Sequence, residues 1–389
     1  MKKLKSILFI VMLFNINFMF SQQNINNLLN QIAQNNPELK AIKENRNSST
    51  YKSRGKLIPL DPEFEYKAKE NNNYETGITQ KLKFPSYYFL QYDTYKLTKK
   101  QQELIFNTFF IDLLTEASLN INKLIYLDKQ INIHKNRKDN AKKLLKFFNK
   151  KLKQGETNQL AVNKAKLHLL KYETLLEELL AKKNTTLNEL TRLNGGKKID
   201  FDINSYQIIP GFQEFSKYKN EYFEHHPEAK LARINLNLAN KRLKVAKHQW
   251  LPDFKVGVHT ESDGNLKMHF GISIPLWQQF NHVNKARADY NKQVYKKEDK
   301  ITAITTKLKQ LYQNYKTSKD NYNQYLKILD QDNTRQLLRK SLKEGEISAI
   351  NYYQEIAKLY QFQDKLQTLR FNMLQNVIRL RDYELLQLK

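Results

Sequence analysis

The sequence has 389 residues, of which 66 are Lys or Arg and 39 are Asp or Glu, so its formal net charge is +27. It contains no cysteine, which excludes disulfides and thiolate metal sites, and we expect no lipid anchor on a cysteine. The basic excess is compatible with binding nucleic acid or an anionic surface, but the lysines are scattered along the chain. We interpret them as the solvated faces of long helices.

Residues 1–22 have the three parts of a secretory signal peptide. A lysine-rich start is followed by an apolar run over residues 7–20, which is too short to span a bilayer. We expect the mature chain to begin near residue 22 or 23. No later stretch offers about 18 uninterrupted apolar residues, so we expect no transmembrane helix.

The next elements are a helix and a strand hairpin. Asn24 to about Lys56 has a helical apolar stripe, which Pro37 should kink or divide. Residues 62–84 alternate between apolar and polar side chains, as the strands of a hairpin do, around a turn at residues 71–73. The apolar positions expected to face lipid, if these strands enter a membrane, include Phe64, Tyr66 and Ile78.

Two long helices should follow. The helical period returns at about Ser86 and continues to about Leu152, which would give a helix on the order of 100 Å long and favours coiled-coil packing. Gly155 should end this helix. The next helix is expected from about Thr157 to Leu193, before the capping sequence at residues 194–196.

A linker at residues 197–212 leads into a second set of the same elements. We expect a helix over about residues 214–249, strands over about 252–275, and a helix that ends near Leu342. Gly345 should break the chain before a last helix from about Ser348 to the C-terminus. The expected apolar face of these strands comprises Phe254, Val256, Val258, Met268, Phe270 and Ile272.

Four pairs of motifs at one fixed offset, 190 residues, indicate an internal duplication. We therefore predict two similar repeats, residues 23–196 and 213–389. The pairs are Asn36-Pro37-Glu38-Leu39 with His226-Pro227-Glu228-Ala229, Asp61-Pro62-Glu63-Phe64 with Leu251-Pro252-Asp253-Phe254, Phe84-Pro85 with Ile274-Pro275, and Lys153-Gln154-Gly155-Glu156 with Lys343-Glu344-Gly345-Glu346.

The four predicted strands are too few for a barrel made by one chain. About eight strands are the practical minimum, and open strand edges are not tolerated in lipid. If the strands cross a membrane, several chains must share one barrel. Aromatic residues beside the hairpins lie where a membrane-interface girdle would be: Tyr87, Tyr88, Trp250 and Trp277. An ordinary half-buried antiparallel sheet is the alternative.

The order and spacing of these elements resemble the TolC family of outer-membrane efflux proteins over nearly the whole mature chain. Matching stretches are Asn36 to Leu39, Trp250 to Val258, Gly271 to Leu276, Lys285 to Asp289 and the two Gly-Glu turns. Residues 250–289 look most like the cation-exporting CusC/CzcC-like branch. The resemblance implies a mainly α fold with a small β part: a homotrimer whose 12-stranded barrel, four strands per chain, stands on a periplasmic α-helical barrel.

The resemblance also implies a passive duct in the outer-membrane lipid, without catalysis, cofactor or nucleic-acid partner. Its periplasmic tips would contact an adaptor protein, which joins it to an inner-membrane pump. The expected adaptor contacts are Lys153, Gln154, Gly155, Glu156, Lys343, Glu344, Gly345 and Glu346. A tight turn between helices needs a residue that accepts positive φ, which is the physical reason for glycine there.

A pore constriction is expected near the second tip. Some family members carry an acidic ring there, and spacing from Gly345 puts the corresponding positions at Asn351 and Gln354, both neutral. We expect a closed tip held by packing and amide hydrogen bonds rather than a cation-binding acidic gate.

Other chemistry is sparse. No nucleotide-binding glycine loop, Gly-x-Ser-x-Gly or His-Glu-x-x-His motif occurs. We interpret Glu224-His225-His226 as a helix cap, and His259 and His269 as polar lumen residues, because two histidines without carboxylates make a poor metal site. The cargo stays open between metal cations, drugs and a secreted protein. A secreted basic coiled-coil protein that binds anionic polymers is the alternative from another class.

Overall fold

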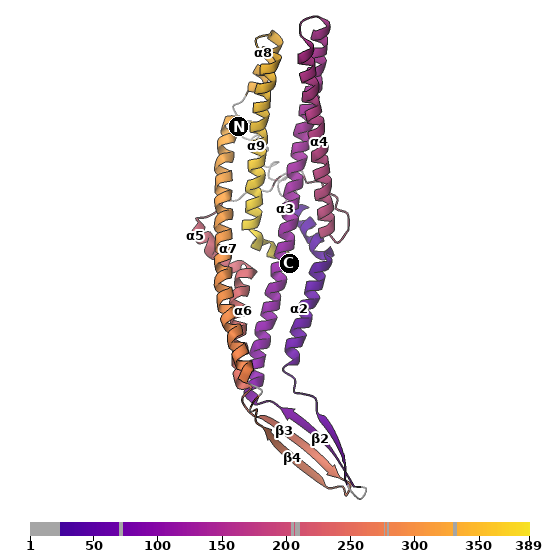
Figure 1. The fold of residues 1–389 in the computed structure, drawn as a ribbon, viewed down its shortest axis with the longest axis vertical. Coiled ribbons are helices and arrows are strands. Elements are labelled where there is room, and N and C mark those ends of the chain that lie inside the picture. The colour runs from indigo at the N-terminus through magenta and orange to yellow at the C-terminus, as the bar shows by residue number, and fades with distance from the viewer. Residues whose placement is uncertain are drawn as a thin grey trace, which may run out of the picture. The chain divides into compact units, whose positions relative to one another are not determined.

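The computed structural model describes residues 24–69, 73–203, 206, 211–275, 277, 280–329 and 333–389. The expected signal peptide and residues 71–72 of the first hairpin turn lie outside the described residues. The fold is mainly helical with one four-stranded antiparallel sheet, as the sequence predicted (Figure 1). The described residues form two compact units. The first unit comprises the described residues within Met1–Pro37, Phe110–Tyr218 and Lys307–Lys389. The second unit comprises those within Glu38–Phe109 and Lys219–Thr306.

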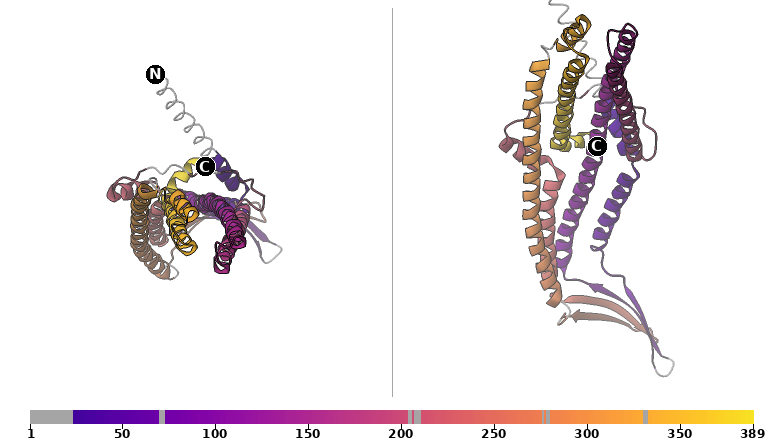
Figure 2. Two further views of the ribbon diagram at one scale, coloured as in Figure 1. Left: turned by 90° about the horizontal axis from the view of Figure 1, so that it is seen from above. Right: turned by 45° about the horizontal axis from the view of Figure 1, so that its top comes forward.

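The helices of the first repeat follow the sequence pattern. Residues 24–35 are helical, and α2 (Pro37–Gly55) begins at the proline, which is tolerated there because the first-turn N–H has no partner within the helix. Helix α3 (Pro85–Lys153) has 69 residues, which corresponds to about 100 Å. Helix α4 (Gln159–Leu193) lies beside it, and a tight turn joins the two (Figures 1 and 2).

The two hairpins form one sheet in the order β1-β2-β3-β4, with all neighbours antiparallel. The strands are β1 (Glu63–Ala68), β2 (Tyr74–Leu82), β3 (Asp253–Glu261) and β4 (Leu266–Ser273). Strands β2 and β3 pair across the two repeats, with Ile78 opposite Val258. Strands β1 and β4 are the edges of this sheet.

The helices of the second repeat depart from the prediction at three places. They are α5 (Phe215–His225), α6 (Pro227–His248), α7 (Phe280–Leu329), α8 (Thr334–Glu344) and α9 (Ala349–Leu380), with a 3₁₀ helix η1 (Asp382–Leu388) at the end.

The expected single helix over 214–249 is wrong, because Pro227 starts a new helix. His226 is the N-cap of this helix, and its Nδ1 accepts the N–H of Glu228 at 3.2 Å. The expected helix to Leu342 is also wrong, since α8 begins separately at Thr334. The sequence from Asp330 to Asn333 is rich in side chains that favour caps over helix interiors. The last helix ends at Leu380 rather than at the C-terminus.

One stretch of α3 is long and apolar enough to cross a membrane by length and composition alone. Half of that stretch is buried inside the protein. Buried residues along α3 include Ile111, Leu114 and Leu124, which is the pattern of a core helix in a bundle.

Candidate functional site

The first candidate surface is the apolar face of the sheet. The register aligns Phe64, Ile78, Val258 and Met268 in one row across all four strands. Most predicted lipid-facing residues are exposed, and Met268 is 73% exposed; they are Phe64, Tyr66, Ile78, Val256, Val258, Met268, Phe270 and Ile272. Phe254 is the exception among the predicted residues, since it is half-buried and its ring lies 5.9 Å from that of Phe84. Contiguous exposed apolar surface marks a contact with membrane or protein. Contact of these residues with lipid stays a prediction.

The opposite face of the sheet carries charged side chains that pair with one another. Lys69 contacts Glu261 at 2.8 Å and Glu75 at 3.4 Å, and Lys267 reaches the other oxygen of Glu261 at 2.8 Å. Two further pairs bridge neighbouring strands or their ends: Lys81 with Glu63, and Lys83 with Asp253. Exposed ion pairs tolerate water but not hydrocarbon, so only the apolar face is suited to lipid.

His259 and His269 lie together on the charged face, as the sequence predicted from their alternation. Their rings meet edge to face at 5.9 Å. His259 lies over Gly77, where an added Cβ would come within 2.2 Å of His259 Nδ1, so the glycine makes room for the ring. Glu75 Oε1 is 3.5 Å from the same nitrogen, a carboxylate that the sequence analysis did not place there. Within the described residues, no group of three or more His, Cys, Asp or Glu could hold a metal ion.

Aromatic residues lie at both ends of the strands. At the helical end, Trp250 and Trp277 are exposed, and the Tyr88 hydroxyl accepts the backbone N–H of Lys83 at 3.2 Å. Near the hairpin turns, Tyr66 and Tyr74 stack at 6.1 Å. The sequence analysis placed no girdle at this second end, although Tyr74 stands beside the predicted turn.

The two Gly-Glu turns have the geometry that the sequence predicted. Gly155 and Gly345 have φ of 73° and 79°. Glu156 N–H donates to Lys151 O at 2.9 Å, and the matching bond in the second turn runs from Glu346 to Ser341, also at 2.9 Å. These bonds satisfy carbonyls at the ends of α3 and α8. All eight predicted contact residues, 153–156 and 343–346, are exposed.

The sequence analysis began the last helix at about Ser348 and the earlier one at about Thr157, but it assigned a cap role to neither Ser348 nor Asn158. Asn158 Oδ1 accepts the N–H of Ala161 at 3.1 Å, and Ser348 Oγ accepts that of Asn351 at 3.2 Å. Their equal spacing from Gly155 and Gly345 was the available signal, since Asn and Ser are strong N-cap residues.

Asn351 and Gln354 are exposed in the first turns of α9. The other side of this helix belongs to a buried apolar cluster that joins the α3–α4 and α8–α9 hairpins and includes Phe148, Val162, Tyr172, Tyr352 and Ile356. A role for Asn351 and Gln354 in a constriction stays a prediction. The neighbouring acidic residue Glu355 is paired with Lys358 at 2.8 Å.

Comparisons with known proteins agree with this architecture. Residues 220–383 match the family model described as outer membrane efflux protein. The fold is similar to that of CusC (TM-score 0.76, 15% identity, 92% of this chain and 91% of that chain), described as forming a transmembrane channel. It is also similar to the outer-membrane channel OprN (0.78, 12%, 93% and 89%) and to the outer membrane protein VceC from Vibrio cholerae (0.72, 12%, 95% and 96%). Comparison with curated protein sequences found no match.

The described residues therefore have the fold that is shared by these solved outer-membrane proteins. The outer membrane efflux protein model matches residues 220–383, and the likeness to the three solved structures extends over 92–95% of this chain. At 12–15% identity, the likeness to these structures establishes the fold.

Proposed function

We propose that this protein is the outer-membrane channel of a tripartite efflux system, a passive exit duct for substrates that an inner-membrane pump drives. The observation that carries the proposal is the four-stranded sheet with an exposed apolar face, a charged opposite face and two open edges. Such a sheet suits a barrel wall between lipid and water. A secreted basic polymer-binding protein has no use for that apolar face.

Three copies of the chain would close the barrel. Strands β2 and β3 have nine residues each, which suits strands that cross a bilayer at a tilt. Edge β4 of one copy would pair with edge β1 of the next, so three sheets of four strands give twelve. Closure satisfies the edge N–H and C=O groups, which lipid cannot do.

The two exposed turns at Gly155 and Gly345 are the proposed contacts with a periplasmic adaptor. They share backbone geometry and a helix cap, so an adaptor could dock on both in equivalent ways. The pump would be reached through this adaptor or directly. Pore closure would involve Asn351 and Gln354.

Metal cations are the proposed cargo, supported by the resemblance of residues 250–289 to cation-exporting relatives. The channel would pass cations as substrate and hold none as a resident ion. Drug efflux and type I protein secretion are the competing cargoes for the same duct.

A deletion strain tests function and cargo together. Sensitivity limited to copper, zinc, cobalt or nickel, and reversed by the wild-type copy, supports cation export. Sensitivity to bile salts, dyes or antibiotics keeps the channel but replaces its cargo. The channel itself is contradicted if the protein is released from membranes by salt alone, because a barrel resists such extraction.

A further inference from the structure

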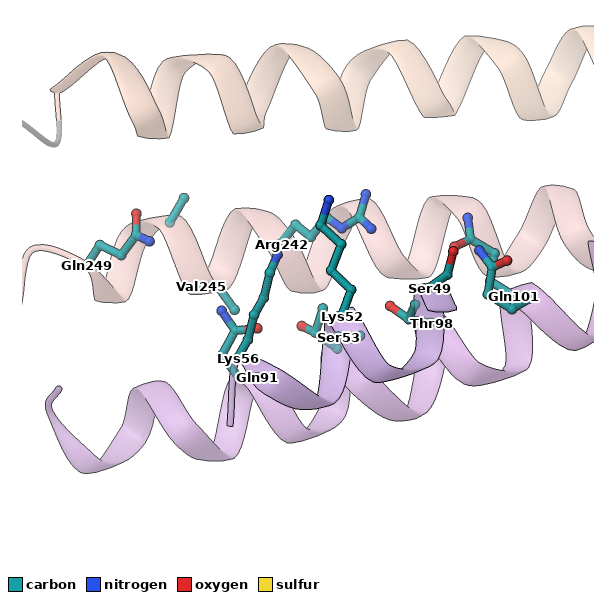
Figure 3. A pocket seen from close by; sticks show the side chains of 13 residues that line it. Ser49, Lys52, Ser53, Lys56, Gln91, Thr98, Gln101, Arg242, Val245 and Gln249 are labelled. Atoms are coloured by element: carbon teal, nitrogen blue, oxygen red, sulfur yellow. The ribbon is translucent and has the colours of Figure 1, made fainter. Parts of the chain in front are cut away.

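A polar cavity of about 420 Å³ lies in the second unit, between α2, α3 and α6 (Figure 3). Its volume falls within the range of small-ligand sites. All of its lining residues belong to this one unit, and none belongs to the strand faces or the helix tips described above.

Three cationic side chains converge on this cavity. Lys52 and Lys56 reach from the end of α2 toward Arg242 on α6 (Figure 3). None of the 13 described side chains that line the cavity is a carboxylate. Asp289 on α7 attracts Arg242, but it is already paired with Lys292 at 2.8 Å. Lys52, Lys56 and Arg242 are all exposed, so an anion from solution can reach the three of them.

Neutral hydrogen-bonding groups form the wall contributed by α3. Gln91, Thr94 and Thr98 are all buried, although polar side chains of this kind are mostly exposed in proteins. Thr94 donates to Leu90 O at 2.9 Å, so its oxygen can still accept, whereas Gln91 brings an amide with two donors. Three cations opposite amide and hydroxyl groups form a site for an anion with several acceptor oxygens.

We propose that this cavity binds a phosphate group, as a monoester or a diester, between Lys52, Lys56 and Arg242. A phosphate offers several oxygens to three cations, and the guanidinium of Arg242 can contact two of them at once. The bound phosphate supplies the negative charge that the lining lacks.

The position of the cavity indicates two sources for the phosphate. Gln249 of its lining directly precedes Trp250, and Gln91 is one helical turn beyond Tyr88. One end of the cavity therefore lies close in sequence to the aromatic residues expected at the membrane interface, where phospholipid headgroups are found. A soluble phosphate in the periplasm is the other source.

The test compares two triple variants of the full-length protein, purified in uncharged detergent. One is Lys52→Gln/Lys56→Gln/Arg242→Gln. The matched control, Lys43→Gln/Lys244→Gln/Lys247→Gln, removes the same charge from exposed positions on the same helices. The probes are inorganic phosphate and dihexanoyl phosphatidylglycerol, with dihexanoyl glycerol as the phosphate-free counterpart. Binding is measured by titration calorimetry and by the shift in melting temperature.

We expect the wild type and the control to bind a phosphate probe at least tenfold more tightly than the cavity variant, with no binding of dihexanoyl glycerol. Binding of both phosphate probes identifies the phosphate group alone as sufficient, and binding of the lipid only identifies a headgroup site. Equal binding by both variants overturns the proposal, as does no binding by the wild type.

Melting in the absence of any probe gives a second readout. Because the cavity variant loses three converging charges, it should melt no lower than the control. A lower melting temperature would show that the cations already have protein partners and would overturn the proposal. These measurements do not involve transport, so their failure leaves the channel proposal intact.

Discussion

Arg137 on α3 pairs with Asp364 on α9, and removing the charge of Asp364 should destabilise the first unit. The side chain is only 4% exposed, and its Nη1 lies 2.8 Å from Asp364 Oδ2. Nη2 donates to Tyr360 O at 3.2 Å, and the guanidinium carbon lies 4.2 Å from the centre of the Tyr360 ring. The perturbation is Asp364→Asn, which keeps the shape of the side chain and removes its charge.

The magnitude follows from the unequal burial of the two partners. Breaking a fully buried ion pair costs about 3–5 kcal/mol, because one charge stays in the protein without its partner. Asp364 is 37% exposed, so water screens the pair, and the guanidinium keeps its contacts with Tyr360. We therefore expect a loss of about 1–2 kcal/mol in the free energy of unfolding, which corresponds to roughly 2–4 °C in melting temperature.

The assay is thermal unfolding of the purified protein, completed as a double-mutant cycle with Arg137→Met. The matched control is Glu355→Gln on the same helix, which breaks the exposed pair with Lys358 and should change stability by less than about 0.5 kcal/mol. If Asp364→Asn changes stability no more than Glu355→Gln, or if the cycle gives no coupling energy, the pair of Arg137 and Asp364 does not contribute to the free energy of unfolding.

Three further predictions concern pH, the membrane and the tips. Burial lowers the pKa of His168 from 6.5 to about 4, so the folded state holds this side chain neutral. The free energy of unfolding should therefore be highest above pH 6.5 and should fall by at most about 3 kcal/mol as the pH falls toward 4. Measured by urea unfolding, this pH dependence should become flatter in His168→Leu and stay unchanged in the exposed-site control His282→Gln. Phe270→Arg on the apolar strand face should destabilise the protein in lipid by about 2–4 kcal/mol and should reduce the amount of heat-resistant trimer seen on gels. If Phe270→Arg loses no more trimer than His269→Arg on the opposite face, the result would count against lipid contact. Gly345→Ala should lower the free energy of unfolding by about 1–2 kcal/mol because Gly345 has a positive φ, although the added Cβ would meet nothing within 4 Å. An unchanged melting temperature would mean that the turn adopts another conformation.

The strands and long helices could be predicted because their patterns are local. Alternation at Phe254, Val256 and Val258 identifies β3, and the distance between Pro85 and Gly155 without a break identifies α3. The break before Pro227 could also have been found, since the first repeat was divided at the matching Pro37. The end of α7 was harder to predict, because helical periodicity continues beyond the Asp-rich sequence after Leu329.

The contacts between distant segments could not be predicted from one sequence. Lys52 and Lys56 lie at and just beyond the end of α2, whereas Arg242 on α6 is almost half the chain away, and no local pattern joins them. The pairing of Lys69 with Glu261 likewise depends on the register of β2 against β3. The proposed adaptor contacts and the constriction at Asn351 and Gln354 remain predictions, because they concern partners and copies beyond a single chain.

The central claim is that three copies close one barrel through β1 and β4, and disulfide cross-linking of isolated outer membranes tests it most directly. The chain has no cysteine, so an introduced pair has no background. Glu65→Cys on β1 is combined in separate variants with Lys267→Cys, His269→Cys or Gly271→Cys on β4, since paired strands bring opposite Cα atoms within disulfide range. The account predicts that at least one register yields a covalent species of three chains in the outer-membrane fraction. Cross-linked pairs without a third chain, or no cross-link between chains at any register, would contradict it.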